Sequence, residues 1–201
     1  MYNEKVNTLK LKKIIDEQNL LKDKKNILAL GIDQGYANLG FALVKYNVHT
    51  DKYKVLTYGT ITTPSKDKLE YRLLQIYDKL ELILNQNNID LIGCEALFAN
   101  GDRKASGNKV RNKSSSIVNT SMSTGVIHLL SAKNNIEIKM FPPTTIKKQL
   151  TGNGRAEKDD IINVVEDLMA KQDLKVKTNH ESDAIAIGIT TISTYIERLL
   201  Q

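Results

Sequence analysis

The sequence has 201 residues, of which 41% are hydrophobic, and its 29 lysines and arginines outnumber its 23 acidic residues to give a formal net charge of +6. This length and composition predict one folded domain rather than a disordered chain, and the positive charge favours nucleic acid or an acidic membrane surface as a partner. A single cysteine, Cys94, excludes an internal disulfide, and no segment approaches the ~20 apolar residues of a membrane span, so we expect a cytoplasmic protein.

The first 25 residues are rich in lysine and differ in pattern from the rest of the chain. Their apolar residues recur at a loose helical spacing, which indicates a short amphipathic helix or a basic arm. Such a segment can pack on the domain, touch DNA, contact a second subunit or stay solvated. We therefore expect an N-terminal arm or helix over residues 1–25 and a folded domain over 26–201.

Three strands joined by turns are predicted next, over residues 27–33, 39–46 and 52–61, because these segments concentrate apolar and β-forming residues. Apolar residues at helical intervals then predict a helix over 66–87. A buried strand is expected over 89–98. This order is typical of a sheet that begins with antiparallel strands and continues through a helical crossover.

A polar, basic loop is expected over residues 100–116, followed by a helix over 117–134 and a strand over 136–141. Apolar residues of this helix belong either to the core or to a subunit interface: Ile117, Met122, Val126, Ile127 and Leu130. Three further helices complete the chain and follow Pro143, Arg155 and Glu181. The whole pattern predicts an α/β fold with a mixed sheet and no second domain.

Acidic side chains stand at the ends of two of the predicted strands: Asp33 ends ILALGID, and Glu95 follows LIGC. An ionised carboxylate beside a hydrophobic core is costly unless it is paired or bound to a metal. Ligands of open α/β sheets gather at the carboxyl ends of strands. The segment NHESDAIAIGI opens the last helix with His180 and Asp183, which lie three residues apart and so share a face. If that helix start abuts the strand ends, the four side chains converge.

Such a cluster suits two Mg²⁺ ions, which activate water and stabilise the leaving oxygen of a phosphodiester. Mn²⁺ is also plausible because it accepts a nitrogen ligand more readily. Each residue alone has a simpler interpretation, with Asp33 as a turn residue, Asp183 as a helix-start acid and His180 as a cap. Their joint placement favours the metal site.

Four segments in this order resemble the RuvC-type Holliday junction resolvases of the RNase H-like superfamily: ILALGIDQGYANLGFALV, CEALF, IKKQLTGNGRAEKDDI and HESDAIAIGIT. The match covers roughly residues 27–194. The resemblance implies an RNase H-like domain with a mixed five-stranded sheet flanked by helices. It also implies a homodimeric, metal-dependent endonuclease acting on four-way junctions and other branched DNA. Asp33, Glu95 and Asp183 match the metal-binding carboxylates, and His180 stands where the family often carries Asp.

The same resemblance implies residues that contact DNA. Lys147 and Lys158 match basic positions near the scissile phosphate, and Phe98 matches an aromatic residue that stacks on an unpaired base. Competing interpretations are a solvated face for these lysines and for Lys148, and a core position for Phe98. The loop after Phe98 is longer and more basic than the family's usual segment, and it is either solvated or able to neutralise phosphates through Arg103, Lys104, Lys109, Arg111 and Lys113.

Two other functions compete with that of a junction-resolving nuclease of bacterial or phage origin. GIDQG also resembles the first phosphate motif of sugar kinases in the actin-like superfamily. Those kinases need a second related domain and a glycine-rich adenosine site, which 201 residues cannot hold. A non-catalytic module that binds branched DNA leaves the acids at two strand ends unexplained. Metal-dependent cutting of branched DNA separates the nuclease from both alternatives.

Overall fold

The computed structural model of the chain describes residues 25–97 and 113–199, with the side chains of 113–116 left aside. Its five strands form one sheet in the order β3-β2-β1-β4-β5. The central strand β1 pairs antiparallel with β2 and parallel with β4, so the sheet is mixed. The strand bounds are Asn26–Asp33 for β1, Asn38–Asn47 for β2, Lys52–Thr62 for β3, Leu91–Glu95 for β4 and Glu137–Phe141 for β5.

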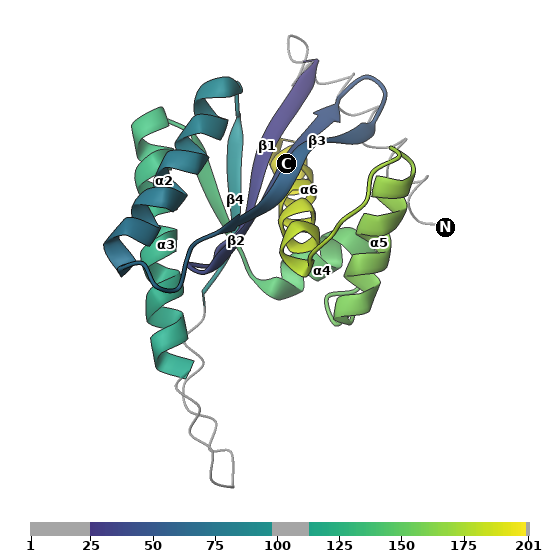
Figure 1. Cartoon of the computed structure of the whole chain (residues 1–201). Coiled ribbons are helices and arrows are strands. Elements are labelled where there is room, and N and C mark those ends of the chain that lie inside the picture. The colour runs from purple at the N-terminus through teal and green to yellow at the C-terminus, as the bar shows by residue number, and fades with distance from the viewer. Residues whose placement is uncertain (1–24, 98–112, 200–201) are drawn as a thin grey trace, which may run out of the picture.

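Helices cover both faces of this sheet and make a three-layer α/β/α sandwich (Figure 1). One face carries α2 (Leu69–Gln86) and α3 (Lys113–Asn134), which pack against each other. The other face carries α4 (Pro143–Thr151), α5 (Lys158–Ala170) and α6 (Asn179–Leu199). The mixed five-stranded sheet flanked by helices therefore confirms the predicted fold class.

Helix α6 is the helix most deeply embedded in the sandwich, and it lies across β1, β2 and β4. Its sequence AIAIGITTI is buried almost all round, with Ile185 and Ile187 in the core. The hydroxyls of Thr190 and Thr191 donate to carbonyl oxygens one turn earlier, so these buried polar groups are satisfied. A Cβ at Gly31 of β1 would collide with the backbone of α6, so glycine there permits the close approach of helix and strand.

The predicted element order is confirmed, with corrections at several element boundaries, and α2 begins at Leu69 rather than at 66. Strand β4 covers Leu91–Glu95 rather than the predicted 89–98; just before it, the Asp90 carboxylate accepts from the Leu28 N–H (2.8 Å), in place of a backbone carbonyl. Helix α3 begins at Lys113, inside the predicted loop, and α6 begins at Asn179. Cys94 is a buried free thiol, as predicted. Among the described residues, no helix is long and apolar enough to cross a membrane.

Candidate active site

Asp33 and Glu95 lie side by side at the carboxyl ends of two neighbouring inner strands. Asp33 is the last residue of β1, and Glu95 is the last residue of β4. Because these strands are parallel and Ile32 pairs with Cys94, the two carboxylates emerge at the same end of the sheet. Both residues are half-buried.

The first turns of α6 bring His180 and Asp183 to the same end of the sheet. His180 Nδ1 lies 2.6 Å from Asp33 Oδ2, a short hydrogen bond. The start of α6 reaches this point because Gly40 of β2 has no side chain: a Cβ there would strike the His180 carbonyl oxygen. Glu181 lies between His180 and Asp183 in the chain and is buried. Its carboxylate accepts a hydrogen bond from the Lys177 N–H (2.7 Å), which holds the segment before α6 against the first turn of the helix.

Burial and like charge act together on the two strand-end acids. Burial raises the pKa of Asp33, the hydrogen bond from His180 opposes that effect, and the charge of Asp183 adds to it. Burial also raises the pKa of Glu95, assisted by the charges of Asp33 and Asp183 and opposed by those of Lys158 and Lys147. The net result is that both carboxyl groups are harder to ionise in the protein than in water.

Lys158 is the first residue of α5, where a cation opposes the helix dipole. A capping box fixes this helix start: the Glu157 N–H donates to the Asp160 carboxylate (2.9 Å), and the Glu157 side chain accepts from the helix backbone. Lys158 Nζ donates to Asp183 Oδ2 at 3.0 Å. The ion pair with Asp183 thus offsets the unfavourable position of Lys158 at the N-terminus of the helix.

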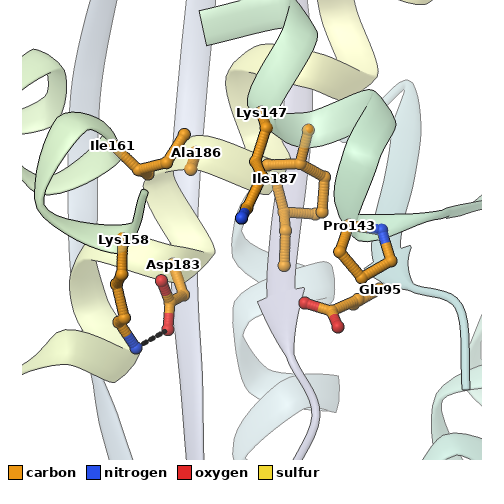
Figure 2. A pocket seen from close by; sticks show the side chains of 9 residues that line it. Glu95, Pro143, Lys147, Lys158, Ile161, Asp183, Ala186 and Ile187 are labelled. Carbon is orange, nitrogen blue, oxygen red and sulfur yellow. Dashed lines mark hydrogen bonds and ion pairs between the residues drawn. The ribbon is translucent and has the colours of Figure 1, made fainter. Parts of the chain in front are cut away.

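Lys147 on α4 completes a pocket of about 270 Å³. Its polar rim is formed by Glu95, Lys147, Lys158 and Asp183, and its apolar wall by side chains of α4, α5 and α6. Figure 2 shows the two lysines and the two acids around one cavity, with Lys158 paired to Asp183. Lys148, the next residue on α4, is exposed and does not line this pocket.

The carboxylate oxygens suit a hard divalent cation such as Mg²⁺, which prefers oxygen ligands and retains several waters. In the described part of the chain, no three His, Cys, Asp or Glu side chains are gathered tightly enough to hold an ion as they stand. His180 hydrogen-bonds Asp33, and Lys158 is paired with Asp183, so two of these acids already have partners within the chain. Two half-buried carboxylates at neighbouring strand ends, both with a raised pKa, fit a divalent cation, whose charge would favour their ionised forms.

Several predicted DNA-contacting residues cannot be placed in this geometry. Lys113 is the first residue of α3, and its side chain is not described. The others lie outside the described residues: Phe98, Arg103, Lys104, Lys109 and Arg111.

One contributor to the site was missed by sequence reasoning. Gln34 is 7% exposed and hydrogen-bonds the backbone of Glu95 through both ends of its amide. In the sequence it is simply the residue after Asp33, and nothing there shows that its side chain turns inward. Its only sequence signal is a polar residue placed between a strand-end acid and a turn glycine.

The sheet order, together with acids at the ends of β1 and β4 and on the helix that crosses them, defines an RNase H-like α/β fold with an acidic site beside two lysines. Comparison with known proteins places this chain more narrowly. The family model for crossover junction endodeoxyribonuclease RuvC matches residues 29–191. The chain therefore belongs to the RuvC family, in which metal dependence is typical.

Curated relatives agree with this assignment. A crossover junction endodeoxyribonuclease RuvC from Syntrophomonas wolfei is 31% identical over 83% of this chain and 88% of its own length. The protein of the same name from Alkaliphilus oremlandii is 33% identical over 81% of this chain and 91% of its own length. The predictions of family and enzyme class are confirmed, and the sugar-kinase alternative loses its support.

Solved structures establish the fold independently. RuvC from Thermus thermophilus in complex with a Holliday junction substrate superimposes with a TM-score of 0.72 at 18% identity, covering 86% of this chain and 97% of that one. A second structure of T. thermophilus RuvC gives a TM-score of 0.67 at 19% identity, covering 82% of this chain and 92% of that one.

Proposed function

We propose that this protein is a metal-dependent endonuclease that resolves four-way DNA junctions by phosphodiester hydrolysis. The observation that carries the proposal is the meeting of Asp33, Glu95 and Asp183 with two lysines at one end of the sheet, in a chain of the RuvC family. A relative of the same fold is described in complex with a Holliday junction substrate, which supports branched DNA as the ligand.

Asp33, Glu95 and Asp183, with His180, are the proposed ligands for two Mg²⁺ ions, or Mn²⁺ in their place. When bound, such ions polarise the phosphate and lower the pKa of an attacking water. The surrounding residues have their own tasks. Besides its proposed part as a ligand, His180 holds the Asp33 carboxylate through their hydrogen bond, and Lys158 and Lys147 would offset negative charge on the phosphate.

Lys158 has two alternative anionic partners in this scheme. It is paired with Asp183 at 3.0 Å, and if Asp183 bound a cation, the ammonium group would be free to donate to a phosphate oxygen. The ion pair therefore keeps a mobile side chain at the site before the substrate arrives. Lys148, exposed on the same helix as Lys147, is proposed to contact the DNA backbone farther from the chemistry.

The remaining DNA contacts are proposed from the sequence. Phe98 would stack on an unpaired base at the junction centre, and the basic residues after it would neutralise phosphates: Arg103, Lys104, Lys109, Arg111 and Lys113. Residues 1–25 are proposed to form an arm separate from the nuclease domain at 26–201. A cytoplasmic location completes the proposal.

A homodimer is proposed because α2 and α3 leave an apolar surface uncovered. Val118, Met122 and Leu129 of α3 recur at helical spacing and are 40–60% exposed. Tyr71, Leu74 and Leu82 of α2 are exposed as well, at 52–58%. An exposed apolar patch built from two neighbouring helices is typical of a protein–protein interface. A second copy paired there would give a two-fold assembly with two active sites.

A cleavage panel tests the nuclease. Labelled four-way junctions, three-way junctions, flaps and duplex are incubated with the full-length protein in Mg²⁺ or in EDTA. We expect cutting of four-way junctions only in Mg²⁺, and loss of cutting with retained binding in Asp183→Asn. Asp167→Asn, on the exposed face of α5, is the matched control and should cut normally. Binding of junctions without cutting by the unmodified protein would favour the non-catalytic module.

A further inference from the structure

The backbone pairing between β1 and β4 stops one residue before Asp33 and Glu95. The parallel pairing of β1 with β4 ends at Ile32 opposite Cys94. Asp33 is paired with Gly40 on the other side of β1, and Glu95 with Phe141 on the other side of β4. Main-chain pairing therefore does not join the two acids to each other across the gap between their strands.

The side chain of Gln34 bridges this gap. The Glu95 N–H donates to Gln34 Oε1 at 3.2 Å, and Gln34 Nε2 donates to the Glu95 carbonyl oxygen. A primary amide presents a donor and an acceptor side by side, so it pairs with both backbone groups of one residue as a neighbouring strand would. The side chain is 7% exposed, which protects both bonds from water.

The backbone that carries Gln34 is itself held in place. Gly35 makes a tight turn, since a Cβ there would collide with the Asn38 carbonyl oxygen. Thr63 fastens the far side of the turn: its hydroxyl donates to the Tyr36 carbonyl oxygen at 2.6 Å and its N–H to that of Ala37 at 3.0 Å. Arg72, 6% exposed, donates to the Thr63 hydroxyl at 2.8 Å and lies 4.2 Å over the Tyr36 ring.

We infer that Gln34 is a positioning residue that sets the spacing of the Asp33 and Glu95 carboxylates for metal binding. Two carboxylates beside each other repel, and the strand ends that carry them would spread apart unless something held them. Gln34 follows Asp33 directly in the chain and grips the backbone of Glu95, so it joins the two acids through a short, buried link. This inference rests on the proposed function, because it assigns the role to that same metal site.

Mn²⁺ binding tests this role without relying on activity. Free Mn²⁺ is followed by electron paramagnetic resonance during titration of the full-length protein and of Gln34→Met, which keeps the length of the side chain and removes both hydrogen bonds. We expect Gln34→Met to bind Mn²⁺ about 10–100-fold more weakly, the loss typical when a group that orients a metal ligand is removed. Junction binding in EDTA should be unchanged.

Gln172→Met is the matched control. Gln172 also makes two side-chain bonds to the backbone, accepting from the Val55 N–H at 3.0 Å and donating to the Leu168 carbonyl oxygen at 3.2 Å, but it lies at the end of α5 away from the acids. Both variants should lose some thermal stability, and only Gln34→Met should lose Mn²⁺ affinity. Wild-type Mn²⁺ affinity in Gln34→Met, or an equal loss in the two variants, would overturn the inference.

A second variant keeps the test decisive if Gln34→Met fails to fold. Gln34→Asn retains the amide on a side chain one methylene shorter, so it cannot keep both bonds, and it should bind Mn²⁺ more weakly than wild type. Wild-type affinity in Gln34→Asn would then overturn the inference. Failure of the proposed function is separate: the unmodified protein would bind no Mn²⁺ and cut no junction, whatever the variants do.

Discussion

Asp33 and Glu95 hold like charges in a half-buried site, and each therefore favours the protonated form more than it would in water. A fold that keeps such a pair gives up stability when no cation lies between the carboxylates. Glu137 shows the opposite shift: hydrogen bonds from Arg198 and Lys139 lower its pKa to about 2, well below its usual value. Neutralising a carboxylate of the first kind should therefore stabilise the fold, whereas neutralising one of the second kind should not.

Glu95→Gln should therefore raise the melting temperature of the metal-free protein at neutral pH, because it removes a charge that burial and two neighbouring acids disfavour. Each kcal/mol of relieved repulsion raises Tm by about 2–4 °C in a chain of this size. Calorimetry in EDTA measures the effect. Glu81→Gln is the control, since Lys133 lowers the pKa of Glu81, and that change should bring no gain.

The pH dependence of this gain has a definite sign. A carboxyl whose folded pKa is raised binds protons more tightly in the folded state, so its unfavourable contribution is present at neutral pH and fades as pH falls through the raised value. The Tm difference between Glu95→Gln and wild type should shrink on acidification. A difference that grows towards acid pH would contradict the assignment of an uncompensated charge at Glu95.

His180 should matter through its 2.6 Å contact with Asp33. We expect His180→Ala to lower the cleavage rate by about 10–100-fold, as expected for loss of a group that holds a metal ligand. His180→Asp should retain more activity in Mg²⁺, since a carboxylate supplies the oxygen ligand that Mg²⁺ prefers. His49→Ala, on the exposed turn after β2, is the control. Wild-type cleavage rates in both the Ala and the Asp variant would reduce His180 to a helix-start residue.

At the scale of single residues, the charged side chains of the candidate site could be proposed from the sequence more readily than the neutral ones. Asp33, Glu95 and Asp183 could be chosen because an acid beside an apolar run is unusual and needs a reason. Gln34 and Gly40 could not, because their roles depend on tertiary contacts: an amide that turns inward to another strand, and a missing Cβ that admits the backbone of α6. Neither contact leaves a periodic signal in the chain.

Among the elements, α6 decides whether the site assembles. It carries His180 and Asp183 and packs on β1, β2 and β4, so it ties the helix-borne groups to the strand-borne acids. Its continuous apolar pattern made it predictable as a buried helix. Its start was less so, because Thr178 and Glu181 fix that end through local hydrogen bonds that pattern alone does not reveal.

Gly40→Ala tests the approach of α6 to β2. The added methyl would collide with the His180 carbonyl oxygen, so the helix start must move away from Asp33 at a cost of about 1–3 kcal/mol. We expect cleavage to fall further than stability alone explains, which a comparison of rate with urea unfolding measures. Gly59→Ala on β3 is the control, since its methyl meets only the Phe41 ring at 3.2 Å. Equal activity in the two variants would separate the site from the placement of α6.

For the whole molecule, the two sides of the sheet have different roles. Helices α4, α5 and α6 lie on one side of the sheet, and α2 and α3 on the other (Figure 1). The first side holds the pocket and its two lysines, and the exposed apolar residues of α2 and α3 lie on the second. The sequence indicated that residues of 117–132 belong to a core or an interface, and the helix divides them: Ile127 and Leu130 are buried in the core, whereas Met122 is exposed. The rotation of α3 about its own axis decides which of its apolar residues face the core, and the spacing of these residues in the sequence does not fix that rotation.

Leu129→Glu tests the apolar surface as a subunit interface. Leu129 is 60% exposed in the single chain, so the change should leave the fold intact while placing a charge in any contact made there. We expect wild type to sediment as a dimer and Leu129→Glu as a monomer. Leu56→Glu, at a 43% exposed leucine on β3, is the control and should remain dimeric. On a cruciform plasmid the dimer should cut both strands and give linear DNA, whereas the monomer should give nicked circles. A dimeric Leu129→Glu would place the interface elsewhere, and a monomeric wild type would remove the two-fold assembly altogether.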